Sequence, residues 1–325
     1  MDQIIQQLTN SRRVFLASHL NPDGDAIGSL IAMGLALEKR GKDVTMYNES
    51  PIPAVYRFLP AVDRITDAMD AEPGSYDAAV VLDCGDLQRV GSHADRLGQI
   101  PVVINIDHHI TNTRFGHHHQ VDAQACATAE IVYRLITAMG VSVDLEMATA
   151  IYTAIFTDTG SFRFSSTNRM AFAICDEMVG IGVDPYKVAQ NVYGTYSLGR
   201  IKLLNLALDS IEIAADGQLS IMTLSQDMLK ETNTHPEDAD GLINYAKRIR
   251  NVRLAALIHE QETNGTAAKA SPPRCHVSLR SDGTIDVARI AAHFGGGGHA
   301  SAAGFNMNAT AAAVKTEIIR IAERL

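Results

Sequence analysis

Residues 13–25 decide the fold, and they read RVFLASHLNPDGD. The stretch 13–17, with its apolar run at 14–16, predicts a short buried strand, and Pro22 and Gly24 predict a tight turn after it. Apolar residues then recur at helical spacing from 26 to 37, which predicts a helix. A strand, a polar turn and a helix in this order form the first unit of an α/β fold.

The same alternation continues along the chain. Apolar runs predict strands at 42–47, 78–82 and 102–106, and helical spacing predicts helices at 127–139 and 145–156. We therefore predict an α/β fold with a mostly parallel sheet covered by helices. We expect a catalytic domain at 1–191, a helical linker at 192–215 and a smaller α/β substrate-binding domain at 216–325. Within the latter, the polar stretch 261–273 predicts a loop between two strands.

Composition limits the function. The 325 residues suffice for roughly two domains. With 28 basic and 37 acidic residues, the net charge is −9, which argues against tight binding to long nucleic acid. No apolar run is long enough to cross a membrane and the first residues are polar, so we expect a cytoplasmic protein without membrane contact. The 4 cysteines show no Cys-x-x-Cys spacing, which predicts neither a zinc knuckle nor a disulfide framework.

Acidic and imidazole side chains follow three of the predicted strands. Because ligands bind at the carboxyl ends of parallel strands, we expect these side chains to meet at one edge of the sheet. A further aspartate is expected in the loop after the helix at 145–156. In chain order, the residues are His19, Asp23, Asp25, Asp83, Asp107, His108, His109 and Asp158.

Five carboxylates gathered at one edge would repel one another, and no Lys or Arg lies in these motifs to neutralise them. Two divalent cations would neutralise them. Mixed carboxylate and imidazole ligands favour Mn²⁺, with Co²⁺ or Fe²⁺ as alternatives. Each aspartate taken alone has a simpler interpretation as a turn residue or a helix cap. The recurrence of the same residue types at four sites favours a metal site.

These motifs also carry a resemblance. His19-x-x-x-Asp23-x-Asp25, Asp83, Asp107-His108-His109 and Asp158 resemble, in this order, the four motifs of the DHH phosphoesterase family. Residues 295–299, GGGGH, and 302–305, AAGF, resemble the signature of the DHH-associated domain.

The resemblance implies a role for each residue. One metal would be bound by His19 and Asp23, the second by Asp25, His108 and Asp158, and Asp83 would bridge both. Asp107 would orient a neighbouring group. His109 would lie near the scissile phosphate as a hydrogen-bond donor or general acid.

The glycine segment and one arginine are candidates for substrate binding. Gly295, Gly296, Gly297 and Gly298 can bring backbone N–H groups close to an anion, although four glycines alone favour a flexible turn. With His299 and the resemblance, we predict a phosphate cradle. Arg280 follows a predicted strand at 276–279, and the resemblance makes it a phosphate-binding candidate. The histidine run 117–119 is interpreted as surface, because adjacent side chains of a strand point to opposite faces.

The predicted activity is two-metal hydrolysis of phosphoesters with Mn²⁺. Within the family, the two-domain chain is similar to the nanoRNase and pAp phosphatase group. This implies that short RNA oligonucleotides and dinucleotides are cleaved to mononucleotides and that 3′-phosphoadenosine 5′-phosphate (pAp) is converted to AMP. Alternatives are a linear or cyclic dinucleotide phosphodiesterase, a RecJ-like single-strand exonuclease and a non-enzymatic nucleotide-binding regulator. Many proteins of this type form dimers, so a homodimer is a candidate assembly.

Overall fold

The computed structural model describes residues 1–194, 196–261 and 273–324. The chain divides into two compact units, Met1–Thr195 and Tyr196–Leu325, and each is described by itself. No helix in the described ranges is both long and apolar enough to cross a membrane. The loop predicted at 261–273 falls mostly on residues 262–272, which lie outside the described residues.

The first unit is built on a six-stranded sheet in which every neighbouring pair of strands is parallel. The strand order is β3-β2-β1-β4-β5-β6. This confirms the predicted α/β fold with a mostly parallel sheet. The strands are β1 (Arg13–Ala17), β2 (Asp43–Tyr47), β3 (Ile65–Thr66), β4 (Ala78–Leu82), β5 (Val103–Asp107) and β6 (His118–Val121).

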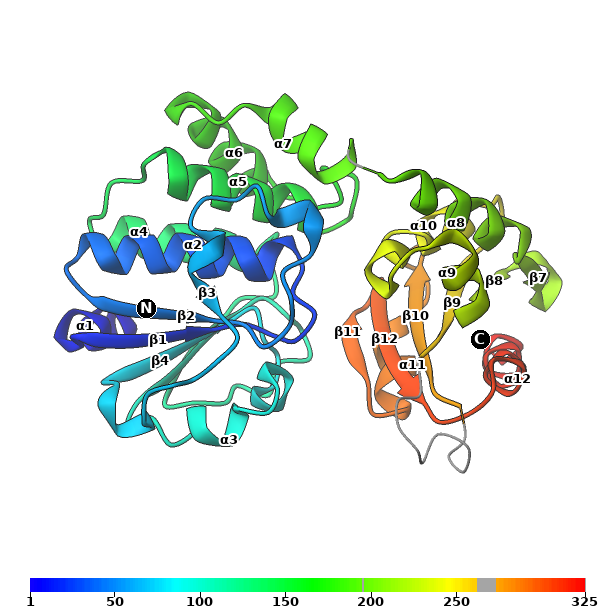
Figure 1. Cartoon of the computed structure of the whole chain (residues 1–325), viewed down its shortest axis with the longest axis horizontal. Helices are drawn as coiled ribbons and strands as arrows, with labels where there is room; N and C mark the ends of the chain where they lie inside the picture. Colours follow the sequence, from blue (N-terminus) through cyan, green and yellow to red (C-terminus); the bar gives the residue numbers. More distant parts are fainter. Residues whose placement is uncertain (195, 262–272, 325) are drawn as a thin grey trace. The chain divides into compact units, whose positions relative to one another are not determined.

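Both faces of this sheet are covered, which explains why its central strands are almost entirely apolar. In β1, Val14 and Leu16 join the core on one face, whereas Phe15 and Ala17 join the core on the other. Helix α2 lies on the first face, and α5 packs against α2 (Figure 1). Because α2 is covered by the sheet and by α5, all of its residues from Gly24 to Leu37 are buried.

Helices alternate with the first two strands of this unit, and four helices in succession follow its last strand. The helix that begins after β1 is two residues longer at each end than the predicted 26–37. The helices are α1 (Asp2–Asn10), α2 (Gly24–Lys39), α3 (Ala94–Leu97), α4 (Thr128–Ala138), α5 (Leu145–Asp158), α6 (Arg169–Ile181) and α7 (Pro185–Tyr193).

The second unit has a mixed sheet with the order β11-β12-β10-β9-β8-β7, in which only the β8–β9 pair is parallel. Its strands are β7 (Glu212–Ala214), β8 (Leu219–Leu224), β9 (Leu254–Glu260), β10 (Cys275–Ser281), β11 (Gly297–His299) and β12 (Ala302–Met307). Its helices are α8 (Leu198–Asp209), α9 (Gln226–Thr232), α10 (Ile243–Lys247), α11 (Val287–His293) and α12 (Ala311–Ala322).

Residues on the two faces of this second sheet enter different cores. Ala256 and Ile258 of β9 join the core that includes residues of α11 and α12, whereas Leu257 joins the one that includes residues of α8 and α10. The segment 192–215, expected as a linker, contains α8. Leu203 of this helix is buried in the core of the second unit.

Candidate metal centre

The strand order of the first sheet reverses between β1 and β4. From β1 the sheet continues through β2 and β3 on one side, and through β4, β5 and β6 on the other. At such a switch point, the loops after the two central strands diverge and leave room for a ligand. His19 follows β1, Asp83 follows β4, and Asp107 is the last residue of β5. The predicted ligands therefore come from neighbouring strand ends.

The start of α2 positions two aspartates. Asp23 caps the helix, because its Oδ1 accepts hydrogen bonds from the backbone N–H groups of Asp25 and Ala26, each at 3.0 Å. Gly24 lies against the end of α5, since a Cβ atom at this position would lie 2.2 Å from Thr157 Oγ1. This close approach brings the C-terminal end of α5, with Asp158, beside the first turn of α2.

Asp158 is the last residue of α5 and does not lie in a loop, which corrects the sequence-based expectation. The helix continues past the predicted end because the backbone N–H of Thr159 still bonds to the carbonyl of Ile155 at 3.1 Å. Asp158 Oδ2 lies 3.6 Å from His108 Nε2. The helix end thus delivers the carboxylate to the cluster.

The beginning of α4 holds two of the aspartates. Asp25 accepts hydrogen bonds from the backbone N–H groups of Thr128 at 2.6 Å and Ala129 at 3.0 Å. The Thr128 hydroxyl donates to Asp83 Oδ1 at 2.9 Å. A helix N-terminus stabilises negative charge through these N–H groups and its dipole. Thr128 was missed from the sequence, where the only signal was a threonine at the start of a predicted helix.

Two histidines direct Nε2 at the carboxylates. His19 Nδ1 bonds to the Leu20 carbonyl at 2.8 Å, and His108 Nδ1 bonds to the Ala125 carbonyl at 3.4 Å. Because a carbonyl only accepts, each Nδ1 carries the hydrogen and leaves Nε2 as the ligand atom. His19 Nε2 lies 3.5 Å from Asp83 Oδ2. His108 Nε2 lies 3.7 Å from Asp25 Oδ2 and 3.7 Å from Asp83 Oδ1.

Asp83 is at the centre of the cluster. Asp83 belongs to three groups of potential metal ligands, and within each group the ligand atoms all lie within 4.8 Å of one another. Its φ is 53°, in the left-handed region, which costs a non-glycine residue about 1–2 kcal/mol. Such strain persists where the surrounding structure enforces a particular side-chain position. The groups are His19, Asp23 and Asp83; Asp25, Asp83 and His108; and Asp83, Asp107 and His109.

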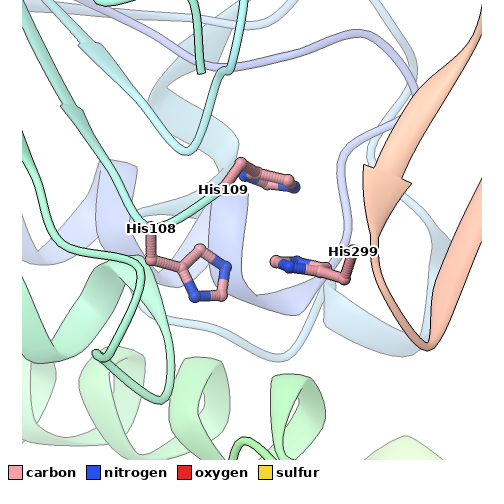
Figure 2. A group of neighbouring side chains, drawn as sticks. All are labelled: His108, His109 and His299. Atoms are coloured by element: carbon pink, nitrogen blue, oxygen red, sulfur yellow. The ribbon is translucent and has the colours of Figure 1, made fainter. Parts of the chain in front are cut away.

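His109 is oriented by Asp107. Its Nδ1 lies 2.7 Å from Asp107 Oδ1, and the Asn112 side-chain amide donates to the other oxygen of the same carboxylate. The rings of His108 and His109 meet edge to face, with centroids 5.0 Å apart (Figure 2). Asn112 was also missed from the sequence, because a side-chain amide in a loop carries no distinctive sequence signal.

The electrostatics of the cluster favour a cation. Burial and then the charge of Asp83 raise the pKa of Asp25 well above its usual range. Burial and then the charges of Asp23 and Asp83 raise the pKa of Asp158 to about 7. The pKa of His108 is lowered by burial, but the surrounding carboxylates outweigh this and raise it to about 10. Protons thus compensate the negative charge, and a divalent cation would replace them. The donor set fits such an ion.

One arginine, Arg89, acts on the cluster through its charge. Arg89 is exposed, and its carbonyl accepts a hydrogen bond from the backbone N–H of Leu20 at 2.7 Å, which ties together the loops after β4 and β1. Burial and the charge of Arg89 lower the pKa of His19, but hydrogen bonding to Asp83 and nearby carboxylate charges outweigh them and raise it. Arg89 was missed from the sequence because it lies six residues beyond Asp83.

Comparison with known proteins identifies the chain. Residues 13–155 match the DHH family, N-terminal domain, and residues 217–325 match the DHHA1 domain. The chain belongs to the DHH family. It is a hydrolytic phosphoesterase. The DHH domain contains the switch point and nearly all of the clustered side chains.

Several known proteins resemble the chain over most of its length. A protein of Thermus thermophilus named bifunctional oligoribonuclease and PAP phosphatase NrnA is 33% identical over 294 residues, which are 90% of this chain and 83% of that one. A probable manganese-dependent inorganic pyrophosphatase of Staphylococcus aureus is 23% identical over 77% of this chain and 79% of that one. The crystal structure of an exopolyphosphatase-related protein from Bacteroides fragilis has a TM-score of 0.89 and 27% identity, with 99% and 95% of the two chains covered.

The DHHA1 domain contains the predicted substrate residues. Arg280 on β10 pairs with Ala302 on β12, which in turn pairs with His299 on β11. Because directly opposed residues of an antiparallel sheet point to the same face, Arg280 and His299 share a face of this sheet. The arginine side chain also donates to the Leu279 carbonyl at 3.0 Å.

The glycine segment of the DHHA1 domain packs closely on β12. A Cβ atom at Gly296 would lie 2.1 Å from the Gly304 carbonyl oxygen, and one at Gly298 would lie 2.5 Å from the Ala302 carbonyl oxygen. Gly295 and Gly298 have φ values of 74° and 140°. The segment is thus not the loose turn considered from the sequence, because a side chain at Gly296 or Gly298 would collide with the neighbouring strand.

Proposed function

We propose that this DHH-family protein uses two Mn²⁺ ions to hydrolyse short oligoribonucleotides to mononucleotides and pAp to AMP. The observation that carries this proposal is the presence of Asp83 in all three groups of potential ligand atoms in the DHH domain. The name of the T. thermophilus relative supports the substrates. The name of the S. aureus relative supports manganese.

The cluster divides into two ligand sets that share Asp83. His19 and Asp23 would hold one ion, and Asp25, His108 and Asp158 would hold the other. Bound divalent cations act as Lewis acids on phosphoryl oxygens and lower the pKa of coordinated water. The hydrogen bonds that α4 donates to Asp25, and those that the Leu20 and Ala125 carbonyls accept from His19 and His108, fix the ligand side chains before the ions bind. Such preorganisation removes the cost of ordering them.

We assign His109 to the scissile phosphate and Asp107 to positioning it. The 2.7 Å bond between His109 Nδ1 and Asp107 Oδ1 fixes the plane of the ring and turns Nε2 away from Asp107. In this role, His109 donates a hydrogen bond to the phosphate or a proton to the leaving oxygen. Asp107 is completely buried, and it acts on the substrate only through His109.

Arg89 is assigned to a phosphate of the substrate. An exposed guanidinium close to a cluster of carboxylates offers bidentate donors to an anion that the aspartates would otherwise repel. In the DHHA1 domain, Arg280, His299 and the glycines at 295–298 are assigned to the terminal nucleotide or phosphate. With a net charge of −9, the chain suits short substrates better than long strands.

A substrate panel tests the proposal. Chelator-treated protein reloaded with Mn²⁺ is offered 5′-labelled RNA of two to twenty nucleotides, pAp, linear and cyclic dinucleotides, and pyrophosphate. We expect mononucleotides from the shortest RNAs and phosphate from pAp, with neither product from Asp83→Ala. If the parent releases no mononucleotide, or if Asp83→Ala matches it, the nuclease assignment is wrong. Absence of phosphate release from pAp removes only the phosphatase assignment.

A further inference from the structure

The loop after Asp158 has an unusual backbone. Gly160, Ser161 and Phe162 lie consecutively in the left-handed region, with φ values of 58°, 60° and 62°. The two non-glycine residues each cost about 1–2 kcal/mol in this conformation. Strain of this kind is maintained where it places a side chain for a task. The loop starts two residues after a carboxylate of the metal cluster.

Surrounding contacts hold the loop in this shape. The Phe162 ring stacks on Phe172 of α6 with centroids 5.1 Å apart and an interplanar angle of 24°. The Ser161 hydroxyl bonds to the Tyr193 hydroxyl of α7 at 2.7 Å. The backbone N–H of Phe162 donates to Thr159 Oγ1 at 3.1 Å. The loop is therefore anchored at several points.

Phe164 is the residue that this anchored loop presents. Its ring lies on Gly160, where an added Cβ atom would be 2.5 Å from ring atoms Cε1 and Cζ. The side chain is nevertheless 39% exposed. Among the described residues no other aromatic ring stacks on it. One face of the ring is thus supported by Gly160, which follows Asp158 of the metal cluster by two residues.

We propose that Phe164 is a stacking platform for a nucleobase of the substrate. The inference rests on the proposed function and adds the part of the substrate that Phe164 contacts. A supported, exposed aromatic ring binds any base through its π face, and stacking of this kind accounts for an affinity factor of about 5- to 150-fold per base. Such a platform next to the phosphoryl site favours nucleotides over inorganic phosphoesters. The simpler role, covering Gly160, requires only an apolar side chain.

Two substitutions separate these roles. Phe164→Leu keeps an apolar contact with Gly160 but removes the π face, and Phe164→Trp keeps both. Tyr186→Leu is the matched control, because Tyr186 is an exposed aromatic residue of α7 with no assigned role. With a diribonucleotide and Mn²⁺, we expect Phe164→Leu to raise KM about 5- to 150-fold with kcat nearly unchanged. Phe164→Trp and Tyr186→Leu should behave like the parent.

An abasic dinucleotide gives the decisive comparison. Its phosphodiester is intact but it lacks bases, so Phe164→Leu and the parent should hydrolyse it equally. Equal losses on the normal and abasic substrates, or no loss on either, would overturn the stacking role.

Binding of AMP and of inorganic phosphate, measured by calorimetry, tests stacking without turnover. Phe164→Leu should weaken AMP binding and leave phosphate binding unchanged. If the parent binds AMP but hydrolyses no RNA, the proposed function fails while the platform stands. If Phe164→Leu binds AMP as tightly as the parent, the platform is wrong.

Discussion

Replacing Thr128 by valine should weaken metal binding without unfolding the protein. The Thr128 hydroxyl is fully buried and donates to Asp83 Oδ1 at 2.9 Å. Valine has nearly the same shape and keeps the backbone N–H that donates to Asp25. A hydrogen bond to a charged group contributes about 1.5–3 kcal/mol. Converted at about 1.4 kcal/mol per factor of ten, this predicts an affinity about 10- to 150-fold lower.

The assay is a calorimetric titration of chelator-treated protein with MnCl₂. Thr153→Val is the matched control, because Thr153 is equally buried and its hydroxyl bonds at 2.8 Å to the Thr149 carbonyl within α5, away from the carboxylates. Circular dichroism of both variants checks that they are folded. The reasoning is refuted if Thr128→Val binds Mn²⁺ within twofold of the parent. It is refuted equally if Thr153→Val loses as much affinity.

Three further predictions concern single contacts. Gly24→Ala should lower the free energy of unfolding in urea by about 1–3 kcal/mol, because the added Cβ would lie 2.2 Å from Thr157 Oγ1. Gly74→Ala is the control, because no atom lies within 4 Å of its added Cβ, and equal stability of the two variants would contradict the clash. Burial lowers the pKa of His259 from 6.5 to about 4. The contribution of the neutral ring to the free energy of unfolding is therefore complete above pH 6.5, and up to about 3 kcal/mol of it is lost as the pH falls through 4. Unfolding of His259→Leu should show less of this acid sensitivity, and an unchanged pH profile would contradict it. Arg89→Ala should raise KM for pAp at least tenfold with little change in kcat, and Arg89→Lys should recover part of this loss. An unaltered KM would show that Arg89 does not bind the phosphate.

Much of the first sheet could be predicted because its strands are short apolar runs. The bounds of β1 and β4 match the predicted strands, since both are buried on both faces and flanked by polar turns. The end of β5 is one residue later than predicted, so that Asp107 belongs to the strand. A charged residue normally indicates the end of a buried strand. Here Asp107 remains in the strand because its two oxygens have partners in His109 and Asn112.

The supporting contacts of the metal centre could not be predicted from the sequence. Thr128 is 103 residues from Asp25 and 45 residues from Asp83, and no local pattern indicates that a helix N-terminus will face these two carboxylates. The contacts of the glycine segment at 295–298 could not be predicted from the sequence either. Its composition indicates freedom of the backbone, whereas the structure shows that Gly296 is required by contact with Gly304 on another strand.

The hydrogen bonds of the cluster also explain why its residues come from separate segments. A buried carboxylate needs donors, and one loop cannot supply enough for several of them. Asp23 uses the N–H groups of α2, Asp25 those of α4, and Asp83 the Thr128 hydroxyl. These donors satisfy each of the three carboxylates separately but do not remove the repulsion among the clustered aspartates. Burial, and then the charges of Asp23 and Asp83, still raise the pKa of Asp158 to about 7. Bound cations would therefore offset the mutual repulsion rather than complete the fold. Replacing Asp83, which belongs to both ligand sets, should accordingly abolish metal binding while the domain stays folded.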